Sequence, residues 1–110
     1  MAFDALDVAI QLATALREPL GKVQQHDRDL AEQARRAASS VALNLGEGQR
    51  RGGRDRVQHF RIAAGSAAEV QTALRLAVAW GHVDPAGLTA ALGLLDRVLA
   101  MTWRLTHPAR

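Results

Sequence analysis

Cysteine and tyrosine are absent from this 110-residue sequence, and tryptophan and phenylalanine occur only twice each. Without cysteine the chain cannot form a disulfide scaffold, a thiolate zinc site or a cysteine nucleophile. Valine (8 residues) and isoleucine (2 residues) are also scarce, so strand-forming residues are too few for a β-sandwich or a β-barrel. These absences exclude disulfide-rich folds and disfavour all-β folds.

Long apolar runs are absent as well. The longest stretch without a charged residue is Pro85–Leu95, which is shorter than the roughly 20 residues that cross a bilayer. The first twenty residues contain charged side chains at Asp4, Asp7, Arg17 and Glu18. A signal peptide would be apolar in this region. We therefore expect a cytoplasmic protein without a membrane partner.

Alanine (22 residues) and leucine (15 residues) supply most of the apolar composition, which amounts to 48% of the chain. Both residues are strong helix formers with little preference for strands. The composition therefore predicts an all-α fold. At this length one hydrophobic core serves the whole chain, so we expect residues 1–110 to form a single domain.

Helical periodicity, together with the positions of proline and glycine, divides the chain into four predicted helices. They span about Asp4–Glu18, Asp27 to Gly48 or slightly beyond, Arg54–Trp80 and Pro85–Thr106. Pro19 is expected to end the first helix because it lacks an N–H group and crowds the preceding turn. Asp27 and Asp84 are expected to cap the second and fourth helices. Short connections then favour an antiparallel up-down-up-down four-helix bundle.

The third predicted helix carries two apolar stripes, whereas a surface helix of a small bundle needs one. The wider stripe contains Val57, Phe60, Ala63, Ala64, Ala67, Leu74 and Val78. The second contains Ile62, Ala73, Leu76 and Trp80, and is interrupted by Ser66 and Glu69. The fourth helix is apolar over more than half of its circumference. Because excess apolar surface indicates a partner, we expect the bundle to self-associate.

The motifs do not indicate a metal site, a nucleotide site or a catalytic serine. The four histidines lie in different segments and lack the spacing of metal ligands. The glycines of Gly46–Gly53 lack the third glycine and the preceding strand of a dinucleotide-binding loop, so we interpret them as a helix end. Ser66 lies within a helix, where a nucleophile elbow cannot form. We expect no cofactor, no small-molecule substrate and no enzymatic activity.

Four polar residues lie on or beside the apolar faces. They are Asn44 and Glu47 on the second helix and Ser66 and Glu69 on the third. An unpaired buried polar group costs about 1–3 kcal/mol. We therefore expect these residues to form a structural network of hydrogen bonds, with one another, with backbone or across a subunit contact. The alternative is an acid–base pair of carboxylates, but no lysine, histidine or tyrosine accompanies them in the pattern.

Positive charge is concentrated in the middle of the sequence. The net charge is −3 over residues 1–34, +5 over residues 35–75 and +1 over residues 76–110. Six arginines of the middle region are candidate phosphate contacts, since a guanidinium group binds phosphate through paired hydrogen bonds: Arg35, Arg36, Arg50, Arg51, Arg54 and Arg61. No aromatic residue is expected on the same face to stack on bases. Binding would therefore depend on backbone charge and shape.

Two segments resemble a bacterial protein family, that of the small proteins encoded within intervening sequences of 23S ribosomal RNA genes. The segment Gln33–Gly48, QARRAASSVALNLGEG, is similar to the family signature RRAASSIPxNIAEG. Phe60, followed by AAGSAAE at Ala63–Glu69, is similar to its second signature, F…A.GSA.E. The chain departs from the first signature at Ala42, where proline is common, and at Gly46, where alanine is common.

The resemblance implies a homopentameric ring of four-helix bundles without known enzymatic activity. A related branch, the accessory variability proteins of diversity-generating retroelements, forms basic pentamers that bind a reverse transcriptase and nucleic acid. We therefore expect a non-enzymatic oligomeric accessory protein that binds RNA or DNA through its arginines. The alternative is a scaffold ring that recruits another polypeptide, with the arginines contacting acidic side chains.

Overall fold

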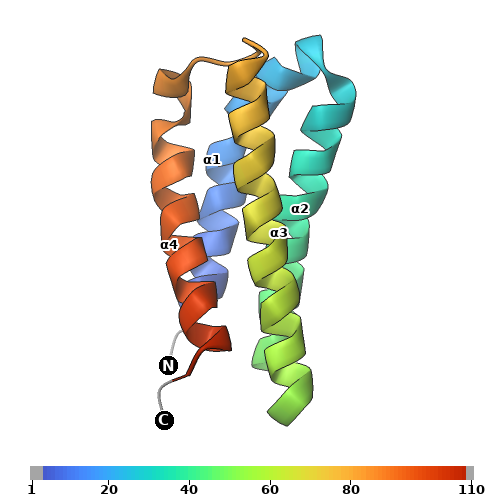
Figure 1. The fold of residues 1–110 in the computed structure, drawn as a ribbon, viewed down its shortest axis with the longest axis vertical. Helices are drawn as coiled ribbons and strands as arrows, with labels where there is room; N and C mark the ends of the chain where they lie inside the picture. Colours follow the sequence, from blue (N-terminus) through green and yellow to red (C-terminus); the bar gives the residue numbers. More distant parts are fainter. Residues whose placement is uncertain (1–3, 109–110) are drawn as a thin grey trace.

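Four long helices make up most of the computed structural model, which describes residues 4–108 (Figure 1). They are α1 (Asp4–His26), α2 (Arg28–Gln49), α3 (Gly53–Ala79) and α4 (Thr89–Thr106). A short 3-10 helix, η1 (Pro85–Leu88), precedes α4. Residues 4–108 contain no β-strand, and the prediction of an all-α fold is confirmed.

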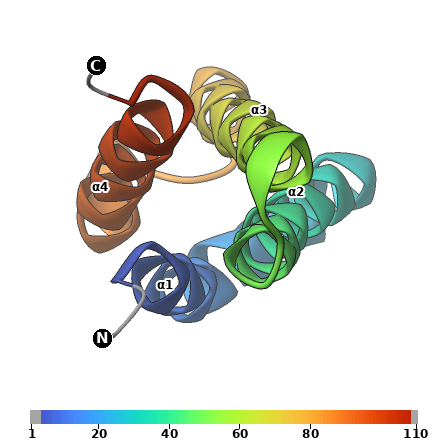
Figure 2. The same ribbon diagram turned by 90° about the horizontal axis from the view of Figure 1, so that it is seen from below.

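Each helix is antiparallel to the next one in the sequence, and α1 packs against α4 to close the bundle (Figures 1 and 2). Seen along the bundle axis, each helix occupies one corner and contacts two neighbours (Figure 2). The bundle measures 44 × 22 × 21 Å. The start of α1 and the end of α4 lie at the same end as the turn between α2 and α3 (Figure 1). This is the up-down-up-down arrangement that the sequence predicts.

The prediction that Pro19 ends the first helix is wrong. Helix α1 continues through Pro19 to His26. Pro19, Leu20 and Val23 are all buried and extend the apolar face of the preceding turns. A proline within a helix costs about 3 kcal/mol. Burial of Leu20 and Val23 contributes about 1.5–3 kcal/mol for each side chain, which is enough to offset that cost.

The two predicted helix caps have different outcomes. The cap at Asp27 is confirmed, because its Oδ1 accepts a hydrogen bond from the N–H group of Leu30 at 3.0 Å. Asp84 makes no such side-chain bond, and its backbone carbonyl accepts a hydrogen bond from the N–H group of Gly87. The fourth helical segment therefore begins as a 3-10 turn over Pro85–Leu88, and not as a capped α-helix.

Helices α2 and α3 approach closely beside their connecting turn, where Gly48 faces the ring of Phe60. A Cβ atom on Gly48 would lie 2.5 Å from Cε1 and 2.8 Å from Cδ1 of that ring. The glycine pattern predicts a helix end here, and α2 ends at Gln49, one residue beyond Gly48. Gly48 also makes room for Phe60. The turn itself requires Gly53, whose φ of +60° disfavours other residues.

Candidate nucleic-acid interface

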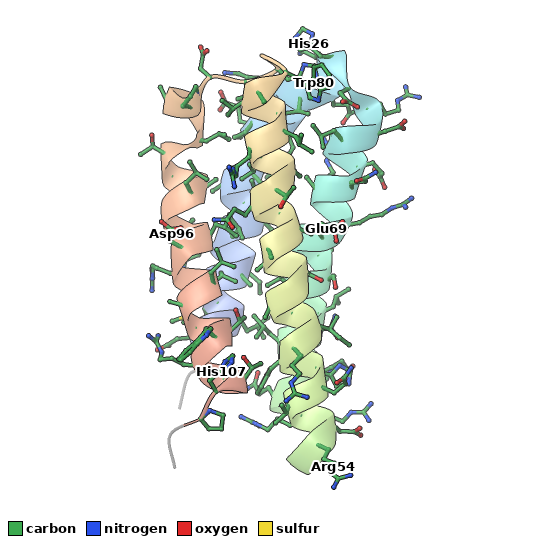
Figure 3. The ribbon with its side chains drawn as sticks, in the orientation of Figure 1. His26, Arg54, Glu69, Trp80, Asp96 and His107 are labelled. Atoms are coloured by element: carbon green, nitrogen blue, oxygen red, sulfur yellow. The ribbon has the colours of Figure 1, made fainter. Side chains whose placement is uncertain are left out.

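Four of the six candidate arginines lie at one end of the bundle, around the turn between α2 and α3. Figure 3 shows Arg54 at this end. With Arg56 they form what we call the basic end: Arg50, Arg51, Arg54, Arg56 and Arg61. Two carboxylates, Glu47 and Asp55, lie in the same segment. Five arginines against two carboxylates give residues 47–61 a formal net charge of +3, with His59 taken as neutral.

Glu47 and Asp55 neutralise part of this charge. Glu47 Oε1 accepts a hydrogen bond from Arg50 Nη2 at 3.1 Å, and its Oε2 lies 3.5 Å from Arg51 Nη2. Arg51 Nη1 also donates to Asp55 Oδ2 at 3.3 Å. These four side chains are between 42% and 73% exposed. Ion pairs this exposed contribute about 0–1 kcal/mol each, so Arg50 and Arg51 can exchange them for a phosphate at little cost.

Arg54 and Arg61 are less neutralised. No carboxylate within residues 4–108 lies within ion-pair distance of either guanidinium group. Both side chains line a broad hollow of ≈ 850 Å³ at the start of α3. Asp55 lines the same hollow, but its carboxylate is already paired with Arg51. The unpaired N–H groups of the first helical turn add partial positive charge beside these two arginines.

Arg56 has a structural role. Its Nη1 donates to the backbone carbonyls of Gly48 and Gln49, at 3.5 and 3.3 Å. Its guanidinium carbon lies 5.0 Å from the centroid of the Phe60 ring. The last carbonyls of a helix lack intrahelical partners and carry partial negative charge. Arg56 therefore caps the C-terminus of α2 and holds it against α3.

Arg35 and Arg36 lie elsewhere, in the middle of α2. They are about 20 Å from Arg50 along the helix axis. The Nε atom of Arg36 donates to Glu32 Oε1 at 3.2 Å. Arg35 lines a separate groove between α1 and α2. The structure thus divides the six candidates into a group of four at the basic end and a pair in the middle of the bundle.

A chain of hydrogen bonds joins α2 to α3 next to the basic end. Asn44 Nδ2 donates to the backbone carbonyl of Ser40 at 2.9 Å, and Asn44 Oδ1 lies 2.9 Å from Nδ1 of His59. Ser66 Oγ donates to Ser40 Oγ at 2.8 Å. Because the Asn44 oxygen accepts, the hydrogen of a neutral His59 sits on Nδ1. These part-buried side chains fix the register of the two helices.

The chain of hydrogen bonds includes only two members of the predicted polar network, Asn44 and Ser66. Glu47 pairs with arginines instead, and Glu69 is exposed on α3 without a hydrogen bond or ion pair to any described residue (Figure 3). Ser40 and His59 were missed. Helical spacing could have identified Ser40, which lies one turn before Asn44. His59 can be placed only when the register between α2 and α3 is known.

Three of the four apolar residues in the second stripe of α3 are exposed, whereas Ala73 is buried in the core. Ile62 is 41%, Leu76 is 44% and Trp80 is 70% exposed. Ser66, on the same side of α3, is hydrogen-bonded to α2, so this stripe borders α2. Leu43 of α2 is 69% exposed. We call these four residues, Leu43, Ile62, Leu76 and Trp80, the outer apolar surface.

An aromatic pair near the basic end has no counterpart among the residues predicted from the sequence. Trp103 and His107, one turn apart at the end of α4, stack with ring centroids 4.3 Å apart and an interplanar angle of 10°. Trp103 is nevertheless 59% exposed. Figure 3 shows His107 toward the same end of the bundle as Arg54. The pair is far from the arginines of the basic end in the sequence, and only the antiparallel fold brings it to this end.

The described residues contain no group of three histidine, cysteine, aspartate or glutamate side chains that could hold a metal ion. Ser66 lies in the middle of α3, where its hydroxyl bonds to Ser40. No helix within residues 4–108 is both long and apolar enough to span a membrane. The side chains best placed to meet a ligand are the arginines of the basic end and the exposed aromatic residues.

The fold and the basic end define a small four-helix bundle protein with arginines concentrated around one turn. Comparison with protein families shows that residues 2–104 match the family described as 23S rRNA-intervening sequence protein. The match covers nearly the whole chain, and the protein belongs to this family, as the two signature segments indicated. A comparison with individual curated proteins found no match. The family description names no catalytic reaction.

Proposed function

We propose that this protein is a non-enzymatic, oligomeric accessory protein whose basic end binds the phosphate backbone of RNA or DNA. The observation that carries the proposal is the position of Arg54 and Arg61. Both line one hollow at the basic end, and no carboxylate of the described chain neutralises them. Exposed guanidinium groups that lack a carboxylate partner favour phosphate oxygens as partners.

The distribution of charge supports this choice of ligand. The formal net charge of +3 at residues 47–61 equals that of the whole chain, so the remainder of the molecule is neutral in sum. A local concentration of positive charge attracts a polyanion more strongly than the net charge suggests. Because such binding releases counterions, its affinity falls steeply with salt concentration.

Self-association, with a homopentameric ring as the expected assembly, is the second part of the proposal. It is supported by the outer apolar surface, because a monomer would leave Trp80 and Leu43 largely in water. In a ring the basic end is repeated once in each copy, which multiplies the charge that a polyanion meets.

Light scattering tests the assembly. The parent is expected to have a mass several times 11.8 kDa. The double variant Ile62→Glu/Leu76→Glu places charge on the outer apolar surface and should lower the mass to that of a single chain. Ile10→Glu is the matched control, because Ile10 is also exposed, at 53%, but lies on α1. A monomeric parent at micromolar concentration would contradict the proposed assembly.

Filter binding of RNA and DNA at several salt concentrations tests the ligand. Replacing Arg50, Arg51 and Arg54 together by glutamine should weaken binding and reduce the salt slope by about 2–3, since each phosphate contact contributes about 0.7–0.9. The control is the triple glutamine variant of Arg28, Arg75 and Arg97, which are exposed and lie outside the basic end. It should bind nearly as well as the parent.

Failure of the parent to bind nucleic acid at low salt would contradict the proposed ligand. The scaffold alternative would then be tested with an acidic polypeptide, polyglutamate, under the same conditions. Binding of polyglutamate alone, abolished by the same three substitutions at the basic end, would assign the arginines to an acidic protein partner.

A further inference from the structure

We propose that the ligand of the basic end is single-stranded nucleic acid, and that one unpaired base stacks on the indole of Trp103. This inference rests on the proposed function and adds the class of nucleic acid to it. It is carried by the position of Trp103 relative to the arginines, by the exposure of its ring and by the stacked imidazole of His107.

Helical register places Trp103 beside the arginines. Leu92 of α4 and Arg75 of α3 line the same groove, so Leu92 lies on the side of α4 that faces α3. Trp103 follows Leu92 by about three helical turns and therefore lies on that same side. Arg61 precedes Arg75 by about four turns. Because α3 and α4 are antiparallel (Figure 1), both steps lead toward the basic end. From the helical rise, Trp103 and Arg61 are then within about one turn of each other along the bundle axis.

The Trp103 ring is accessible to a base although His107 stacks on it. His107 covers the ring from one side, at a centroid distance of 4.3 Å, and yet 59% of Trp103 is exposed. The imidazole is held in place, since its Nδ1 lies 2.9 Å from the carbonyl oxygen of Trp103 and 3.1 Å from Thr106 Oγ1. A ring already fixed from one side loses little freedom when a base stacks on the other.

An exposed indole next to arginines that lack a carboxylate partner favours binding of a single strand over a duplex. Bases inside a duplex already stack on their neighbours, so only an unpaired base can use the indole. Arginines beside a stacking residue then contact the phosphates of the same strand. Asp96 lies about two turns before Trp103 on the same side of α4 and repels phosphate. The strand is therefore expected to run from Trp103 toward Arg54 and Arg61, away from Asp96.

The two tryptophans provide a direct test, because Trp80 lies at the opposite end of the bundle (Figure 3). Trp80→Phe leaves Trp103 as the only tryptophan, and Trp103→Phe leaves Trp80. Each variant is titrated with a short single-stranded RNA, the same sequence as DNA, and the matching duplex. Fluorescence of Trp103 should be quenched by either single strand and unchanged by the duplex. Fluorescence of Trp80 should not respond to any of them.

Affinity is measured separately, by the anisotropy of a dye at the end of each oligonucleotide. Trp103→Ala should weaken binding of the single strands about 5- to 100-fold and leave duplex binding unchanged. Trp103→Phe should restore most of the loss, because phenylalanine can still stack. Circular dichroism melting of the Trp103→Ala variant shows whether the bundle remains folded, and the Trp80→Phe titration does not depend on that variant.

The outcomes separate this inference from the proposed function. Binding of nucleic acid without quenching of Trp103, or binding of the duplex as tightly as the single strand, would overturn the inference and leave the basic end as a phosphate-binding surface. Absence of binding to every oligonucleotide at low salt would overturn both. Quenching of Trp103 together with a selective loss in Trp103→Ala would support both.

Discussion

The two ends of the bundle use their polar residues in opposite ways. At the end opposite the basic end, Asp27 forms the connection between α1 and α2, and its carboxylate accepts a hydrogen bond from the N–H group of Leu30. The same carboxylate lies 3.6 Å from Nε2 of His82, and His82 stacks on His26 at 5.5 Å. We call this the capped end. Its polar groups satisfy one another.

At the basic end, side-chain packing and Arg56 hold the end of α2 against α3, while other arginines face solvent. Gly48 admits the Phe60 ring, and Arg56 binds the last carbonyls of α2. Arg54 and Arg61 contribute to neither task. The residues that stabilise the basic end therefore differ from the arginines proposed to bind nucleic acid, and we expect substitutions to change one property without the other.

The largest effect on stability is expected from Gly48→Ala. The added methyl group must displace the Phe60 ring, which should lower the free energy of unfolding by about 1–3 kcal/mol. Gly21→Ala is the matched control, because a Cβ atom at this position of α1 would meet no neighbouring side chain within 4 Å. It should raise the free energy of unfolding by about 0.5–1 kcal/mol. Urea denaturation measures both, and equal midpoints for the two variants would contradict the close contact.

Asn44→Ala is expected to have the next largest effect. It removes the hydrogen-bond partner of His59 and one bond to Ser40, which should lower the free energy of unfolding by about 1–2 kcal/mol. Gln33→Ala, an exposed amide on the same helix, should have little effect. Thermal melts of both variants test the role of the hydrogen-bond chain. A melting temperature equal to that of the parent would show that Asn44 does not stabilise the bundle.

Asp27→Ala tests the capped end. Loss of the cap on α2 should reduce stability by about 1 kcal/mol. Asp84→Ala should cost less, because the Asp84 side chain makes no cap hydrogen bond. Neither substitution should weaken the proposed nucleic-acid binding, since both lie at the end opposite the basic end. Weaker binding by Asp27→Ala in a folded protein would contradict the division of roles between the two ends.

The smallest effect on the folded chain is expected for Glu69→Ala. Glu69 is exposed, so the free energy of unfolding should change by less than about 0.5 kcal/mol in dilute protein. The substitution lies on the same side of α3 as the outer apolar surface, and its effect on assembly is measured by light scattering. A large loss of stability confined to the assembled state would place Glu69 in a subunit contact.

Much of the fold was predictable because the relevant interactions are local. The spacing of apolar residues predicts each helix, and Asp27 was identified as a cap from its residue type and position. Pro19 was misjudged because the cost of a proline is local, whereas the burial of Leu20 and Val23 that offsets it depends on the neighbouring helices. The end of α2 beside Gly48 was also predicted from the glycines, but the contact between Gly48 and Phe60 depends on how α2 and α3 pack.

The candidate site likewise combines features that the sequence predicts with features that depend on packing between helices. The sequence by itself determined four helices, a positively charged middle region and a third helix with more apolar surface than one core needs. Only the tertiary structure decided that Arg35 and Arg36 lie apart from the arginines of the basic end, that His59 bonds to Asn44, and that the stacked pair of Trp103 and His107 lies toward the basic end. Helix formation follows from residues a few positions apart, but the meeting of side chains from different helices depends on rotation and register. Both are set by packing of the whole bundle.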